Sequence, residues 1–307
     1  MVELDFTGKG IDSMDSMKRL NVGLNAGLNG APGRTRLGRR RFLHSCALAV
    51  AGGAIFPHRS WSQQAPASAG PASPELIEDL VAANRVLADQ GVVDGFGHVS
   101  VRHDQSPDRY LISRSLAPAL VTAADILEYD LDSRPVDARG RNLYSEVFIH
   151  GEIYKTRPDV NAVVHSHAPS VIALGVAGVS PRPVYHMSSF IGSGLPVFDI
   201  RKEMGEDTNM LVRTAERGRA LARVLGKRPA ALMRGHGAVI TANALPLVVF
   251  RSVYLQINSA LQAQALSLNP GTTFLTEREA ELVDKELWDQ NRHLRAWELW
   301  KEKAMGR

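Results

Sequence analysis

The chain has 307 residues, 44% of them hydrophobic, which is enough for one sizeable core or at most two domains. Its formal net charge of +4 arises in residues 1–67, which carry nine Lys or Arg against four Asp or Glu, whereas the remainder carries 27 basic and 28 acidic residues. Because the basic excess belongs to the N-terminal region, the composition gives no reason to expect a nucleic-acid partner.

Residues 1–72 have the features of a leader followed by a linker. Residues 38–44 read Gly-Arg-Arg-Arg-Phe-Leu-His, the pattern of a twin-arginine export signal, and the apolar run at 46–56 is too short to span a bilayer, which takes about twenty residues. Small residues at 65–67 offer a cleavage site. We therefore predict a periplasmic or secreted protein without a stable membrane anchor; the alternative is a cytoplasmic protein with a basic tail.

The cysteine content limits the kinds of metal site that the rest of the chain can build. The one cysteine, Cys46, lies in the leader. Residues 73–307 therefore have no thiol for a disulfide or a thiolate ligand. A metal ion bound there must be held by His, Asp or Glu.

Helices and strands alternate through residues 73–307. Ser73 is a good N-cap, Pro74 suits the first helical position, and apolar residues follow at helical spacing up to Leu87, with Gly91 to end the helix. Two short strands are expected at residues 99–101 and 110–112. Further helices are predicted at 146–155, 169–174, 209–225, 245–268 and 277–305, and further strands at 160–165, 230–233 and 238–240. This order indicates one three-layer α/β/α domain.

Three histidines form the first chemical signal. His165 and His167 stand two residues apart at the end of a predicted strand, so their side chains point to the same face. His236 lies between two glycines, which allow a sharp turn and a close backbone approach, and is the natural third ligand. Three neutral imidazoles suit zinc, manganese, iron or cobalt and leave coordination positions open. The alternative is a set of unrelated polar histidines.

Glu146 is the candidate acid/base beside this cluster. It lies nineteen residues before His165, at the start of a predicted helix. Near a cation, a carboxylate there can act as general acid/base or as a further ligand. The alternative is a helix-terminal carboxylate that favours the helix dipole.

Four motifs, in order, resemble the class II aldolase and adducin head-domain family. They are G-H-V-S-V-R at 97–102, S-E at 145–146, N-A-V-V-H-S-H at 161–167 and G-H-G at 235–237. The resemblance runs from about residue 75 to 268. It implies a mixed, mostly antiparallel sheet of nine strands between helices, and a homotetramer with sites at subunit borders. It also implies that His165, His167 and His236 are metal ligands and that Glu146 is the acid/base.

Two departures from the aldolase motifs bear on the substrate. His98 stands where the aldolases have Asn, which makes it a second catalytic candidate. Ser113-Arg114-Ser115 replaces a phosphate-binding loop, and the planar fork of Arg114 suits a carboxylate, unless it forms a surface salt bridge. Ser113, Arg114 and Ser145 are the substrate-binding candidates.

Three further segments look like a decarboxylase branch of the family, which acts on hydroxylated aromatic or pyridine dicarboxylates. They lie at 112–118, 148–154 and 184–188. The sequence therefore predicts a carbon–carbon lyase that depends on Mn²⁺ or Zn²⁺. The first interpretation is a decarboxylase of a hydroxylated dicarboxylate. A retro-aldol lyase acting on a hydroxy-keto acid or sugar comes second, and a non-catalytic adducin-like module third.

Overall fold

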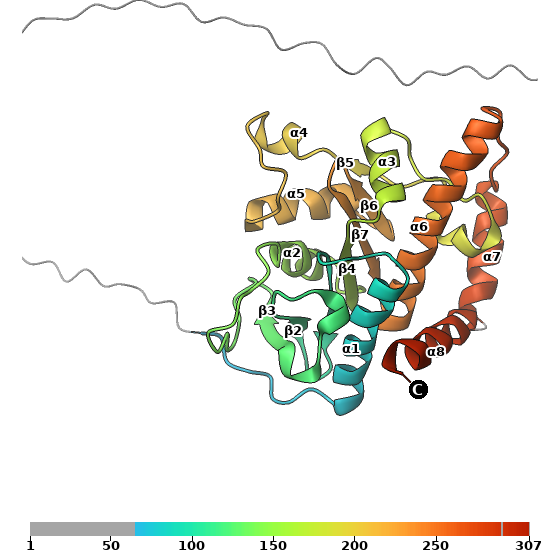
Figure 1. The fold of residues 1–307 in the computed structure, drawn as a ribbon. Helices are drawn as coiled ribbons and strands as arrows, with labels where there is room; N and C mark the ends of the chain where they lie inside the picture. The colour runs from blue at the N-terminus through green and yellow to red at the C-terminus, as the bar shows by residue number, and fades with distance from the viewer. Residues whose placement is uncertain (1–64, 290, 307) are drawn as a thin grey trace, which may run out of the picture. The chain divides into compact units, whose positions relative to one another are not determined.

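The computed structural model describes residues 65–289 and 291–306 (Figure 1). The chain divides into two units, residues 1–60 and 61–307, and the fold below is that of the second. The predicted twin-arginine signal and Cys46 lie outside the described residues. Within the described part, no helix combines the length and hydropathy needed to cross a bilayer.

A seven-stranded sheet forms the centre of the domain, in the order β3-β2-β1-β4-β7-β6-β5. Every neighbouring pair is antiparallel except β5 and β6, so the predicted mixed, mostly antiparallel sheet is confirmed. The strands are β1 (His98–His103), β2 (Ser106–Ser113), β3 (Ile126–Asp130), β4 (Ala162–Ser166), β5 (Val197–Phe198), β6 (Ala230–Met233) and β7 (Gly237–Ala242).

The described residues form seven strands, two fewer than the family resemblance implies. Beyond β3 the sheet continues only as an isolated bridge between Tyr129 and Pro135. Proline has no N–H to donate to a ladder, so a further strand does not develop there.

Helices cover both faces of the sheet (Figure 1). They are α1 (Pro74–Asp89), α2 (Phe148–Thr156), α3 (Pro169–Ala177), α4 (Ile200–Met204), α5 (Ala215–Leu225), α6 (Leu245–Leu268), α7 (Glu277–Asp289) and α8 (Arg292–Met305), with 3₁₀ turns at Pro118–Leu120, Ala123–Asp125 and His186–Ile191. Val164 packs into the core shared with α1, α3 and α6, whereas its neighbour Val163 packs into the core shared with α2 and α5. This alternation along β4 produces the three predicted layers.

Two predicted helices differ from the structure. The helix expected at 209–225 begins only at Ala215, because the Thr214 side chain caps it by accepting from the Arg217 N–H at 3.3 Å. The helix expected at 277–305 is divided between α7 and α8, and Asn291, with φ +50°, holds the left-handed conformation at the break.

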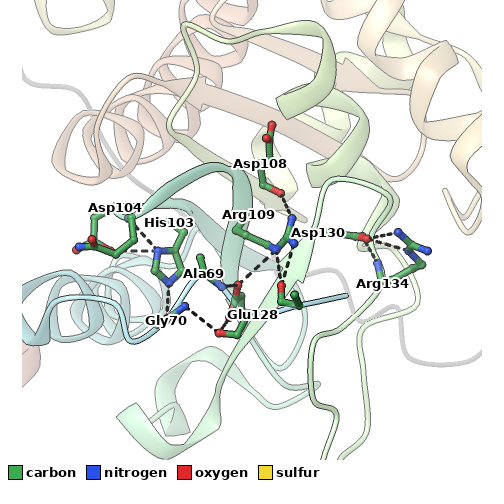
Figure 2. A network of polar contacts seen from close by, with 12 residues as sticks. Ala69, Gly70, His103, Asp104, Asp108, Arg109, Glu128, Asp130 and Arg134 are labelled. Carbon is green, nitrogen blue, oxygen red and sulfur yellow. Dashed lines mark hydrogen bonds and ion pairs between the residues drawn. The ribbon is translucent and has the colours of Figure 1, made fainter. Parts of the chain in front are cut away.

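Part of the predicted linker is held against the edge of the sheet, as Figure 2 shows. The Arg109 side chain donates to the Ala67 carbonyl at 2.8 Å, and the Ala69 N–H donates to Glu128 Oε1 at 2.8 Å. His103 Nε2 lies 3.2 Å from the Gly70 carbonyl. These contacts join the segment before α1 to β1, β2 and β3.

Candidate metal centre

The middle of the sheet brings the predicted histidines together. His165 lies near the end of β4, opposite His98 of β1 on one side and Val239 of β7 on the other. His167 follows β4 directly, and His236 lies in the tight turn between β6 and β7. The pairing of β4 with β7 therefore brings together histidines that are about seventy residues apart in the chain.

The three imidazoles are arranged as a ligand set. One nitrogen from each of His165, His167 and His236 lies within 4.8 Å of the other two. The Nε2 atoms of His165 and His167 are 3.0 Å apart. His165 Nδ1 lies 3.1 Å from the Ala238 carbonyl and His236 Nδ1 3.1 Å from the Met210 carbonyl. A carbonyl can only accept, so both Nδ1 atoms carry the proton and both Nε2 lone pairs are free, which fits a divalent metal ion.

The two glycines beside His236 have different steric roles. Gly235 has φ +65°, a left-handed backbone conformation that residues with a side chain rarely adopt. A Cβ on Gly237 would lie 1.9 Å from the Ser166 carbonyl oxygen, so the close approach of β7 to β4 requires the absence of a side chain.

Replacing Gly237 with alanine should therefore displace the His236 turn from β4. We expect a destabilisation of about 2 kcal/mol or more, typical of overpacking, and a clear loss of metal affinity. Thermal unfolding and elemental analysis would measure the two effects. Gly95→Ala is the control, because nothing lies within 4 Å of a Cβ at that exposed loop position and its φ lies outside the left-handed region, as does that of Gly237. Equal behaviour of the two variants would contradict the close-approach argument.

Glu146 faces the imidazoles. Its Oε2 lies 3.6 Å from His236 Nε2 and 3.9 Å from His165 Nε2, and its Oε1 accepts from the Val212 N–H at 2.7 Å. Burial alone raises the pKa of this carboxyl, but the nearby imidazoles of His236 and His165 lower the pKa to about 2. The carboxylate is therefore ionised and held at the mouth of the ligand set, before the first residue of α2.

A chain of buried polar groups leads away from the cluster behind His98. His98 Nδ1 lies 2.7 Å from His150 Nε2, and His150 Nδ1 lies 2.6 Å from Ser100 Oγ. Ser100 Oγ in turn lies 2.8 Å from the Tyr154 hydroxyl. His150 thus holds His98 from behind. Ser100 and Tyr154 are missed by sequence reasoning, although Ser100 lies inside the first family motif.

Burial of these imidazoles gives the metal-free protein a defined pH dependence. Burial lowers the pKa of His150 to about 3, against an ordinary value of about 6.5 in the unfolded chain. Below pH 6.5 the unfolded state binds the proton and the folded state does not, so stability falls as the pH falls. His150 alone should contribute about 1.4 kcal/mol per pH unit in this range. Chemical denaturation of the metal-free protein between pH 7 and 4 measures the slope, and His150→Gln should make it shallower; an unchanged slope would exclude this origin.

The substrate-binding candidates are placed less uniformly. Ser113 is buried at the end of β2, and its Oγ lies 3.2 Å from the hydroxyl of Tyr144, whose ring is 4.5 Å from that of His98. Arg114 Nε donates to Asp125 Oδ1 at 2.7 Å, so this side chain forms the ion pair that the sequence leaves as its alternative role. Ser145 is exposed next to Glu146. Tyr144 is a neighbour of the site that no sequence motif indicated.

The layered fold is that of an aldolase-type domain. Residues 78–263 match the family described as Class II Aldolase and Adducin N-terminal domain, and the chain belongs to this family. The resemblance found in the sequence is therefore confirmed.

Two of the curated relatives are decarboxylases, the branch that the sequence indicates. Decarboxylase tropJ of Talaromyces stipitatus is 35% identical over 246 residues, covering 73% of this chain and 92% of the relative. The 3,4-dihydroxyphthalate decarboxylase of Arthrobacter keyseri is 31% identical, covering 67% and 86%. Beta-adducin of Rattus norvegicus is 26% identical and covers 60% of this chain but only 25% of its own. The chain is thus grouped with carbon–carbon lyases.

Solved structures agree on the fold. An aldolase II superfamily protein from Pseudomonas syringae superposes with a TM-score of 0.63 at 22% identity, covering 76% of this chain and 94% of its own. L-fuculose 1-phosphate aldolase from Glaciozyma antarctica gives a TM-score of 0.61 at 21% identity, covering 78% and 96%. At these identities the likeness shows the architecture alone.

Proposed function

We propose that this chain is a divalent-metal-dependent decarboxylase of hydroxylated aromatic dicarboxylates. The observation that carries the proposal is the convergence of three imidazole nitrogens within 4.8 Å, with the Glu146 carboxylate 3.6 Å from one of them. The names of the relatives at 31–35% identity favour decarboxylation over the other lyase reactions.

His165, His167 and His236 would hold the metal ion, either Mn²⁺ or Zn²⁺, as the chemistry of three neutral nitrogen donors allows. When bound, the ion supplies Lewis-acid polarisation of substrate oxygens. The imidazoles of His165 and His236 are fixed beforehand by the carbonyls of Ala238 and Met210, so these two ligands need little reorganisation on binding.

The reaction breaks the bond between a ring carbon and a carboxylate carbon. Carbon dioxide leaves, the bonding electron pair stays on the ring, and a proton must replace the lost group. Glu146 would take a proton from a substrate hydroxyl beside the imidazoles and return one to carbon, with His98 as the second proton-carrying group. The ring of His98 lies 5.1 Å from that of His165, centroid to centroid.

The buried chain behind His98 determines which of its nitrogens carries the proton. The Tyr154 phenol is more acidic than the Ser100 hydroxyl, so we assign it as the donor to Ser100 Oγ, 2.8 Å away. Ser100 then donates to His150 Nδ1, and His150 Nε2–H donates to His98 Nδ1. In this arrangement His98 is neutral and presents Nε2–H, a donor for a substrate oxygen or carbanion.

Arg114 is proposed to orient the carboxylate that the product keeps. Its Nε already pairs with Asp125, and the side chain is 32% exposed, which leaves the Nη groups for a second carboxylate. Arg114→Ala should raise KM about tenfold or more with unchanged metal content, since a charge-assisted hydrogen bond is lost. Steady-state kinetics measures KM, with Arg223→Ala as the control because Arg223 is an ion-paired arginine on α5. An unchanged KM would leave Arg114 with its structural role alone.

The experiment that tests the function is incubation of purified protein with 3,4-dihydroxyphthalate and related hydroxylated dicarboxylates, with and without Mn²⁺ or Zn²⁺. Metal-dependent release of carbon dioxide with formation of a dihydroxybenzoate supports the proposal. Release of an aldehyde from hydroxy-keto acids or sugar phosphates instead would favour the retro-aldol alternative. Binding without turnover in either metal would favour an adducin-like module.

Assembly as a homotetramer with sites at subunit borders and export through the twin-arginine pathway are further parts of the proposal. Exposed apolar side chains close to the site motifs support an interface there, namely Phe96, 71% exposed, and Val176, 57% exposed. Light scattering measures the assembly, and a monomer would contradict the tetramer. Mass spectrometry of the secreted protein measures export, and an intact N-terminus retained in the cytoplasm would contradict it.

A further inference from the structure

A cavity lies at the end of the two central strands that is away from the metal ligands. It has a volume of about 470 Å³ and is lined in part by Val160, Thr241 and Ala242. Ala242 is paired with Ala162 at the start of β4, whereas His165 is paired with Val239 three residues further along. The metal ligands are absent from its lining, so it is separate from the candidate metal centre.

A largely buried cation, Arg251 of α6, lines this cavity. Its Nη1 donates to the Thr241 carbonyl at 2.8 Å, which fixes the guanidinium. Its Nε is shut off from solvent without a hydrogen-bond partner among the described residues. Within that part of the chain, no carboxylate oxygen forms an ion pair with Arg251; Asp284 of α7 acts on it only from further away. A buried charge without a partner is costly, which favours an anion as occupant.

The remaining charges of the lining also leave a positive excess. Arg157 and Asp159 pair with each other at 2.6 Å and neutralise one another at the rim. Lys227, an exposed residue after α5, adds a second cation, and Asp284 is the one carboxylate left to oppose the two. A small anion can therefore enter between Lys227 and Arg251.

An apolar wall completes the cavity. Phe190 and Leu247 line it, and the Arg251 guanidinium lies 5.9 Å from the centre of the Phe190 ring. A ring stacked beside Phe190 could place a carboxylate at Arg251, an arrangement that inorganic phosphate cannot exploit.

We propose that this cavity is a second ligand site, for a small aromatic carboxylate anchored by Arg251. The site does not depend on the reaction proposed above, because it shares no residue with the metal centre. The cavity lies at the far ends of β4 and β7. His165 lies in β4 and His236 directly precedes β7, so the same two strands run between the two sites.

The test is calorimetric titration of the full-length, metal-loaded protein with benzoate and with inorganic phosphate. Arg251→Met, which keeps the volume and removes the charge, should weaken benzoate binding about tenfold or more. Asp284→Asn should tighten it about fivefold, because a like charge is removed. Arg278→Met, an exposed arginine on the same helix as Asp284, should change nothing.

Three results would overturn the proposal. They are the absence of benzoate binding to the unmodified protein, equal benzoate affinity of the Arg251→Met and Arg278→Met variants, and phosphate binding as tight as benzoate binding. Should Arg251→Met fail to fold, Asp284→Asn decides, since misfolding cannot produce tighter binding; an unchanged or weaker affinity in that variant counts against the site. His165→Ala should retain benzoate binding here, which separates this site from the metal centre.

Discussion

Replacing His165 with alanine is expected to reduce metal affinity more than about 100-fold and to abolish turnover. His165 is fully buried in the middle of the sheet, and its Nε2 faces those of His167 and, across the cluster, His236. Removal of this ligand leaves two imidazoles, too few to hold a divalent ion in a site with open positions.

Elemental analysis after dialysis measures this loss, with circular dichroism to confirm the fold. His186→Ala is the matched control, because His186 is an exposed histidine in a 3₁₀ turn outside the cluster. Retention of a full equivalent of metal by His165→Ala would remove the site from the account.

Glu146→Gln should keep the metal and lower kcat by about 10²- to 10⁴-fold, the usual contribution of a positioned acid/base. Glutamine can still accept the Val212 N–H, so the segment before α5 should stay in place. What is lost is the ionised carboxylate between His165 and His236.

Steady-state kinetics and metal analysis of the same preparation separate the two possible roles of Glu146. Glu216→Gln, an exposed glutamate on α5, is the control and should be close to the unmodified protein. A near-normal rate would exclude Glu146 as the acid/base, whereas loss of the metal would assign it as a fourth ligand.

Local pattern predicted most of the fold. The Ser73 cap forms as expected, with its Oγ accepting from the Leu76 N–H at 3.3 Å, and the strand expected at 160–165 forms as β4. The prediction of helix over residues 209–214 was wrong. The amphipathic spacing of this segment continues that of α5, but the helix begins only after the Thr214 cap. Such a cap competes with propensity over a few residues, which periodicity does not reveal.

The same segment shows why the site could only be predicted in part. His165 and His167 follow from strand spacing, whereas the Met210 carbonyl and the Val212 N–H that hold His236 and Glu146 are backbone groups with no sequence signal. Likewise, the ion pair of Arg114 with Asp125 depends on the turn before β3 folding back onto the end of β2. Tertiary contacts of this kind cannot be inferred from one chain segment at a time.

The most direct test of the account is a stoichiometric assay with carboxyl-labelled 3,4-dihydroxyphthalate and the metal-loaded protein. The account predicts one labelled carbon dioxide for each dihydroxybenzoate formed, with activity lost on chelation and restored by Mn²⁺ or Zn²⁺ in proportion to the metal bound. Turnover that persists at full rate in protein stripped of metal would contradict the claim that His165, His167 and His236 form a catalytic metal centre.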